Sequence, residues 1–121
     1  LMKGRNPSAK EKAYHDLLAS NIGCLACLHD HGARNTYGSI HHIDGRTRPD
    51  AHWLVLHLCA GHHQDGYGLP GQLAVHGAKA RFEAMYGTQL ELMALGARQL
   101  LDMGYALPPR VIELAGLQEY A

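Results

Sequence analysis

The chain has 121 residues, of which 46% are hydrophobic and 18% are charged. This supplies one hydrophobic core, so we expect a single domain over residues 1–121. No apolar run approaches the roughly 20 residues that a membrane-spanning helix needs, which excludes a transmembrane protein and favours a soluble, cytoplasmic one. Eleven basic residues balance eleven acidic ones, whereas a protein that coats DNA electrostatically is usually strongly basic.

The first predicted elements are a helix and a hairpin. Residues 8–11 read Ser-Ala-Lys-Glu, a capping box that begins a helix over about residues 9–19. Residues 28–36 read as a polar, structureless loop. The runs 37–43 and 53–58 favour β-strands, and the Gly and Pro residues between them predict an antiparallel hairpin with a long loop.

The second half of the chain alternates helix-favouring runs with glycine and proline. Thr-Gln-Leu-Glu at residues 88–91 repeats the capping form. We expect helices over residues 59–64, 78–86, 88–103 and 108–120, with a Gly-rich segment over 65–71. The predicted fold class is therefore α+β, with helices around a small hairpin.

Three cysteines and ten histidines in so short a chain favour metal binding over disulfides, because three cysteines cannot all pair. Cys24-x-x-Cys27 and Cys59-x-x-His62 have the number and spacing of ligands of a closed tetrahedral zinc site. This set predicts a structural Zn²⁺. Two alternatives are a local site of Cys24, Cys27, His29 and His31, and a pair of buried free thiols.

Two adjacent histidine pairs point to a second ion. His41 and His42 lie on a predicted strand, where successive side chains point to opposite faces, so the two residues serve different purposes. His62 and His63 are about 100° apart on a predicted helix. If His62 faces the zinc, His63 faces elsewhere. A strand histidine and a helix histidine can then converge on a second cation with open coordination positions.

These motifs resemble the HNH (ββα-metal) endonuclease superfamily. The resemblance is carried by Ile40-His41-His42-Ile43, by the strand 54–58, and by Leu58-Cys59-x-x-His62-His63. More narrowly, the runs 3–7, 24–27, 41–52 and 58–63 are similar to the Ref family of phage recombination-enhancement, RecA-dependent nucleases. The resemblance covers residues 2–87, followed by a helical segment over 88–121. It implies a small zinc-stabilised ββα-metal core surrounded by α-helices.

The resemblance also implies roles for individual residues. His41, His63 and His76 would ligate a catalytic divalent metal, and His42 would be the general base that activates water. The central Asn of the HNH pattern is absent. Asp50 or His52 would take its place, orienting the His42 ring or the loop.

The implied reaction is hydrolysis of a DNA phosphodiester with Mg²⁺, Mn²⁺, Ni²⁺ or Zn²⁺ as the catalytic metal. Phosphate contacts need cations near the metal, and the expected DNA-binding residues are Arg46, Arg48, Lys3 and Arg5. Implied partners are DNA and a RecA filament, in the cytoplasm of a bacterial host that carries a phage or prophage.

Two other function classes fit parts of the pattern. A non-catalytic, zinc-stabilised module that binds DNA or protein would use the cysteine site and leave His42 without a purpose. A metal-sensing or storage protein would explain the number of histidines but not their positions on a strand and a helix.

Overall fold

The computed structural model describes residues 4–120 and has an α+β fold. Strands β1 (Ser39–His42) and β2 (Val55–Leu58) pair antiparallel, with Ser39 opposite Leu58 and His42 opposite Val55. The helices are α1 (Ala9–Leu17), α2 (Leu25–His31), α3 (Ala60–His63), α4 (Lys79–Tyr86), α5 (Gln89–Asp102) and α6 (Pro109–Ala115), and a π-helical turn η1 (Leu18–Ile22) directly follows α1. Among the residues described, no helix combines the length and apolarity needed to cross a membrane.

The predicted capping box begins α1. The Glu11 backbone N–H donates to Ser8 Oγ at 3.2 Å, and the Ser8 N–H donates to the Glu11 carboxylate at 2.8 Å. The helical segment runs past residue 19, because η1 adds a wider turn to it. This turn closes where the Gly23 N–H donates to the Leu18 carbonyl at 2.8 Å, with Gly23 at a φ of 69°.

The polar loop predicted over residues 28–36 is wrong in its first part, because α2 continues to His31. Leu28 packs against the core and extends the buried face that Leu25 and Cys27 begin. The helix ends at Gly32, whose φ of 68° suits a left-handed cap. Residues 28–31 therefore belong to a helix, and the loop begins at Gly32.

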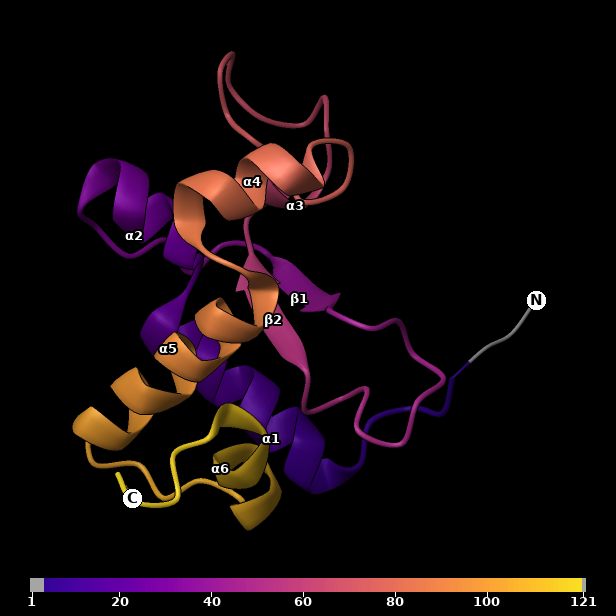
Figure 1. The fold of residues 1–121 in the computed structure, drawn as a ribbon, viewed down its shortest axis with the longest axis vertical. Coiled ribbons are helices and arrows are strands. Elements are labelled where there is room, and N and C mark those ends of the chain that lie inside the picture. Colours follow the sequence, from indigo (N-terminus) through magenta and orange to yellow (C-terminus); the bar gives the residue numbers. More distant parts are fainter. Residues whose placement is uncertain (1–3, 121) are drawn as a thin grey trace.

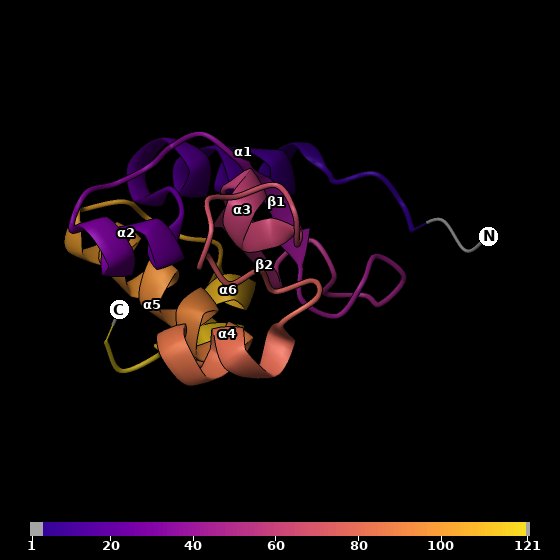
Figure 2. The ribbon, with the colours of Figure 1, turned by 90° about the horizontal axis from the view of Figure 1, so that it is seen from above.

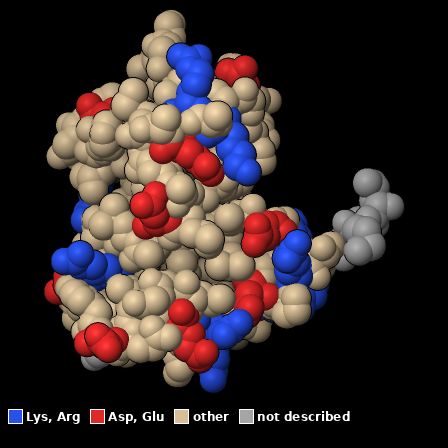
Figure 3. All heavy atoms as spheres, viewed as in Figure 1, with Lys and Arg blue, Asp and Glu red and all other residues tan. Residues whose placement is uncertain are grey.

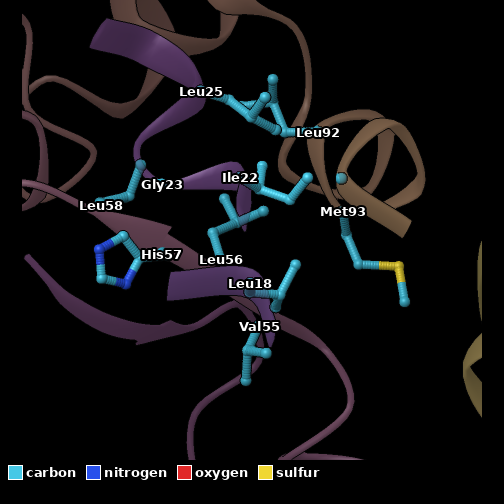
Figure 4. A pocket seen from close by; sticks show the side chains of 11 residues that line it. Leu18, Ile22, Gly23, Leu25, Val55, Leu56, His57, Leu58, Leu92 and Met93 are labelled. Atoms are coloured by element: carbon cyan, nitrogen blue, oxygen red, sulfur yellow. The ribbon is translucent and has the colours of Figure 1, made fainter. Parts of the chain in front are cut away.

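The core lies between η1, β2 and α5. Leu92 and Met93 of α5 line a pocket together with Ile22 and the β2 side chains (Figure 4). Gly96 of α5 also faces this core, because a Cβ built there would lie in ordinary van der Waals contact with Leu18, at 3.5 Å. Helices α1, α5 and α6 lie toward one end of the hairpin, and α3 and α4 lie toward its other end (Figure 1). Seen from above, the hairpin lies between α1 and α4 (Figure 2).

Candidate metal centres

The first cluster joins two cysteines at the start of α2 to the segment that follows β2. Cys24 and Cys27 each place Sγ 3.5 Å from His62 Nδ1. Cys59 Sγ lies 3.1 Å from the same nitrogen and 3.6 Å from Cys27 Sγ. Zinc–sulfur bonds of about 2.3 Å at tetrahedral angles put ligand atoms roughly 3.5 to 3.8 Å apart. The four side chains could therefore hold a zinc ion at their centre.

Burial and protonation fit a cation at this position. Cys24 and His62 are fully buried. Burial raises the pKa of the Cys24 thiol to about 12 and also raises the pKa of Cys27. Without a cation these thiols keep their protons, whereas a bound dication displaces the protons and offsets the cost of buried negative charge.

Neighbouring side chains orient the ligands of this cluster. The His62 Nε2–H donates to Asp30 Oδ2 at 2.9 Å, which leaves Nδ1 facing the sulfurs. The Tyr86 hydroxyl donates to the same carboxylate oxygen at 2.8 Å, and Asn35 Nδ2 donates to Cys27 Sγ at 3.5 Å. Such hydrogen bonds around a metal site fix the tautomer and the ring orientation of a ligand histidine.

The alternative local site does not form among the described residues. His29 contacts Asp30 and stands edge-on to the Tyr86 ring, with centroids 5.1 Å apart. His31 is exposed at the end of α2. The cluster that the fold assembles combines Cys24 and Cys27 with Cys59 and His62.

The second cluster consists of His41, His63 and His76, whose candidate ligand atoms all lie within 4.8 Å of one another. His41 comes from β1 and His63 from the end of α3. His76 joins them because its N–H donates to the His63 carbonyl at 3.1 Å, next to a parallel bridge between Gln64 and residue 76. His41 is buried, His63 is half-buried and His76 is exposed.

Two residues that the sequence analysis did not single out orient these rings. Gln89, buried at the start of α5, donates through Nε2 to Glu83 at 3.2 Å, so its Oε1 faces His41 and accepts the Nε2–H at 2.7 Å. Ser39 Oγ lies 3.1 Å from His63 Nδ1. These contacts leave Nδ1 of His41 and Nε2 of His63 for a cation.

Protonation in this cluster also suits metal binding. Burial lowers the pKa of His41, and burial together with His76 lowers the pKa of His63. Both imidazoles are therefore neutral at pH 7 and keep the lone pair that a metal ligand requires. Three imidazoles fill three positions of a tetrahedral or larger coordination shell, so such a site keeps open positions for water or substrate.

His42 belongs to a separate chain of hydrogen bonds. The Arg5 carbonyl can only accept, so the His52 Nε2 atom that lies 2.7 Å away carries a proton. In neutral His52 the Nδ1 atom then accepts, and the His42 Nε2–H donates to it at 3.0 Å. The His42 Nδ1 atom is left without a proton, and it has no hydrogen bond to any described residue.

The surroundings of His42 keep it uncharged. Burial and the nearby Arg46 charge, followed by smaller contributions from His52, His15 and His41, lower the pKa of His42 to about 4. His15 holds the other side of this chain, because its Nε2 lies 2.7 Å from the His52 carbonyl oxygen. His42 is thus a neutral imidazole at pH 7 that can accept a proton.

Of the two residues predicted to orient His42, His52 forms the hydrogen bond to it, whereas Asp50 contacts a different side chain. The Asp50 carboxylate accepts from Arg110 at 2.7 and 3.0 Å. This contact ties the loop between β1 and β2 to the start of α6. Asp50 has no hydrogen bond to His42, so its predicted catalytic role gains no support from these contacts.

The predicted DNA contacts also differ in their surroundings. Arg5 is engaged by Glu11 through two hydrogen bonds of 2.6 and 2.7 Å. Arg46 and Arg48 are exposed in the loop between the strands, and Lys3 lies outside the described residues. Basic and acidic side chains are interspersed over the face seen in Figure 3, so this face carries no extended field of one sign.

Comparison with known protein families gives a match over most of the chain. Residues 7–101 match the family described as recombination enhancement, RecA-dependent nuclease. The matched segment contains both clusters and His42, and it extends into α5, where Gln89 contacts His41. The chain therefore belongs to the RecA-dependent nuclease family.

Proposed function

We propose that this nuclease is a metal-dependent DNA endonuclease of the HNH type. His41, His63 and His76 hold a divalent cation, and His42 is the general base. The observation that carries the proposal is the hydrogen-bond chain from the Arg5 carbonyl through His52 to His42. It leaves an unprotonated nitrogen on the residue that follows a candidate metal ligand.

The chemical step needs a base and an electrophile. A water molecule gives a proton to His42 Nδ1, and its oxygen forms a bond to phosphorus. The bond from phosphorus to the 3′ oxygen breaks, and this oxygen takes a proton from solvent, which leaves 5′-phosphate and 3′-hydroxyl ends. His52 holds the His42 ring with Nδ1 free for this proton, because the His52 Nδ1 atom accepts the Nε2–H of His42.

A divalent cation, when bound by the three histidines, polarises the phosphate and stabilises charge on the leaving oxygen. The cysteine cluster has a different purpose. Three thiolates and one imidazole close a tetrahedral shell around Zn²⁺ and leave no position for substrate. The role we assign to Cys24, Cys27, Cys59 and His62 is therefore structural.

The partners follow from the family and from the loop between the strands. DNA is the substrate, presented by a RecA filament, and the protein acts in the cytoplasm of a bacterium that carries a phage or prophage. Exposed Arg46 and Arg48 contact DNA phosphates on either side of the cut. Arg46 already lies close enough to His42 to lower its pKa.

The test is cleavage of supercoiled plasmid and of single-stranded DNA by the zinc-loaded protein, with and without a RecA filament. Mg²⁺, Mn²⁺, Ni²⁺ and Zn²⁺ are added separately, beside the His42→Ala variant. We expect cleavage by the wild type with at least one metal, and a loss of about 10²- to 10⁴-fold in the variant. Zinc content and circular dichroism establish that the variant is folded.

Two results would overturn the proposal. Cleavage by His42→Ala at the wild-type rate would show that His42 is not the general base. If the wild type cleaves no DNA with any of the metals, even with the RecA filament present, the zinc-stabilised binding module is favoured instead.

A further inference from the structure

A closed loop connects two of the three histidines of the second cluster. Residues 64–76 leave α3 directly after His63 and return at His76. The Asp65 N–H donates to the His76 carbonyl at 3.1 Å, beside the parallel bridge between Gln64 and His76. The loop projects away from the core above α3 and α4 (Figure 1). The two ends of the loop are therefore held at the cluster.

The loop has a defined path at its near end. Gly68 packs on Gly61 of α3 so closely that a Cβ on Gly61 would lie 2.7 Å from the Gly68 Cα. Gln72 accepts the Leu69 N–H through Oε1 at 2.7 Å, which closes the next turn. Tyr67 stands just before this contact, and its N–H donates to the Gln64 carbonyl. Its backbone is thus held on both sides.

Tyr67 faces a cavity that it shares with His63. The cavity has a volume of about 270 Å³ and is lined by Ser39, Ala60, His63, Gln64 and Tyr67. The Tyr67 side chain is 71% exposed, and Tyr37, although 86% exposed, does not line this cavity. An exposed aromatic ring beside a cavity with hydroxyl, amide and imidazole groups is suited to a flat ligand that has polar edges.

We propose that Tyr67 is a stacking platform for an unpaired nucleobase next to the scissile phosphate, a site that rests on the nuclease function proposed above. With the phosphate at the histidine cluster, the neighbouring base would occupy the cavity that His63 lines. Gln64 and Ser39 also line this cavity, and an amide and a hydroxyl suit the polar edge of a base. Bases inside a duplex are already stacked on one another, so the site selects single-stranded or unwound DNA. Stacking accepts any base, because every base has a π face.

The test uses full-length, zinc-loaded protein in the non-cutting His42→Ala background with added Mg²⁺. Fluorescence anisotropy measures the Kd for a labelled thymidine oligonucleotide and for a matched strand in which every nucleotide is abasic. We expect Tyr67→Ala to weaken binding of the thymidine strand by about 5- to 150-fold and binding of the abasic strand by less than about twofold. Tyr67→Phe keeps the ring and should keep the affinity.

Leu69→Ala is the matched control. Leu69 is on the same loop and is 70% exposed, but it lines a different pocket, together with Met85 and Tyr86. Its replacement should leave both affinities unchanged. The affinities of the two strands for protein with intact Tyr67 give a second measure. If bases stack on Tyr67, the thymidine strand binds more tightly than the abasic strand.

The proposal is overturned if Tyr67→Ala weakens both strands equally, if it weakens neither, or if the thymidine and abasic strands bind intact protein with the same affinity. Failure of the nuclease function has a different signature. If binding depends on the bases and on Tyr67 but the wild type does not cleave DNA, the stacking site is supported and the endonuclease function is refuted.

Discussion

Hydrogen bonds to the second nitrogen of each imidazole decide what the histidines can do. Gln89 fixes the proton of His41 on Nε2, and His52 fixes that of His42 on the same atom. Both rings therefore carry a lone pair on Nδ1, one available to a cation and the other to a proton. Adjacent residues with the same tautomer thus differ in chemistry because of where their free nitrogen lies.

Replacing Gln89 by Leu removes the acceptor that orients His41. We expect the affinity of the three-histidine cluster for its divalent metal to fall about 10- to 100-fold, because the ring loses its fixed tautomer. Calorimetric titration of zinc-loaded protein with Mn²⁺ measures this change without any cleavage assay.

The control for this substitution is Gln99→Leu in the same helix. The Oε1 atom of Gln99 is buried without a hydrogen-bond partner among the described residues, so replacing it should leave metal affinity unchanged. Equal affinities of Gln89→Leu and wild type would show that Gln89 does not position His41.

At the scale of elements, the start of α1 positions the segment that ends the hydrogen-bond chain. Glu11 is buried, caps α1 and binds the Arg5 guanidinium. The Arg5 carbonyl in turn accepts the proton of His52. Arg5 was predicted to contact DNA. In this structure its guanidinium binds Glu11 and thereby anchors the backbone carbonyl that bonds to His52.

This anchor predicts a pH dependence. The Arg5 hydrogen bond holds the pKa of Glu11 at about 2, below its ordinary value of 4.5. Because the folded-state pKa is lowered, the contribution is present above about pH 4.5 and is lost as the pH falls toward 2. We expect Glu11→Gln to lower the free energy of unfolding at pH 7 by about 2 kcal/mol, less than the full shift implies because Arg5 is half exposed.

The measurement is urea unfolding of both proteins from pH 7 downward, as far as both remain folded. Release of zinc at low pH affects the two proteins alike and cancels in their difference. The difference should shrink below about pH 4.5. A difference that stays constant with pH would show that the Glu11 charge contributes nothing.

Local sequence signals predicted the caps of α1 and α5 and the positions of both strands, because these depend on residues near one another in the chain. They failed at α2, where apolar contacts of Leu28 with the distant core extend a helix into polar sequence. The π-helical turn after α1 was also missed. It depends on a residue five positions away and on the path of the chain after Gly23.

Helix α4 contributes to the surroundings of both candidate metal centres. Glu83 accepts from Gln89, which orients His41, and Tyr86 donates to Asp30, which orients His62. The two residues are three positions apart and so lie on neighbouring parts of one helix surface. A single short helix thereby ties together the surroundings of the two clusters.

At the scale of the whole molecule, the cysteine cluster joins α2 to the end of β2 and the start of α3. A two-stranded hairpin is marginally stable alone, and a zinc site of this kind contributes about 10 to 16 kcal/mol, as much as the whole stability of a small domain. Removing zinc with a strong chelator should abolish the cooperative thermal transition, and one equivalent of Zn²⁺ should restore it.

Two variants accompany this experiment. Cys27→Ser should lose the zinc and the transition together, whereas His63→Ala should keep both, because His63 belongs to the other cluster. A chelated protein that unfolds at the same Tm as the zinc-loaded protein would contradict a structural role for the metal.

Local spacing predicted the cysteine cluster, as in Cys24-x-x-Cys27 and Cys59-x-x-His62, whereas the set of His41, His63 and His76 was implied by the family resemblance. Gln89 and Asp30 carried no such signal. They reach the ligands through the packing of α5 and α2, which no short motif encodes. The choice between Asp50 and His52 likewise needed the path of the loop between the strands.

The central claim is that His42 is a base and the other three histidines are ligands, and a single-turnover cleavage assay over a range of metal concentrations tests it most directly. We expect His76→Ala to need more metal and to regain rate when metal is raised. We expect His42→Ala to stay about 10²- to 10⁴-fold slow at saturating metal, with an unchanged half-maximal concentration. Recovery of the His42→Ala rate at high metal, or cleavage at the wild-type rate, would contradict the assignment.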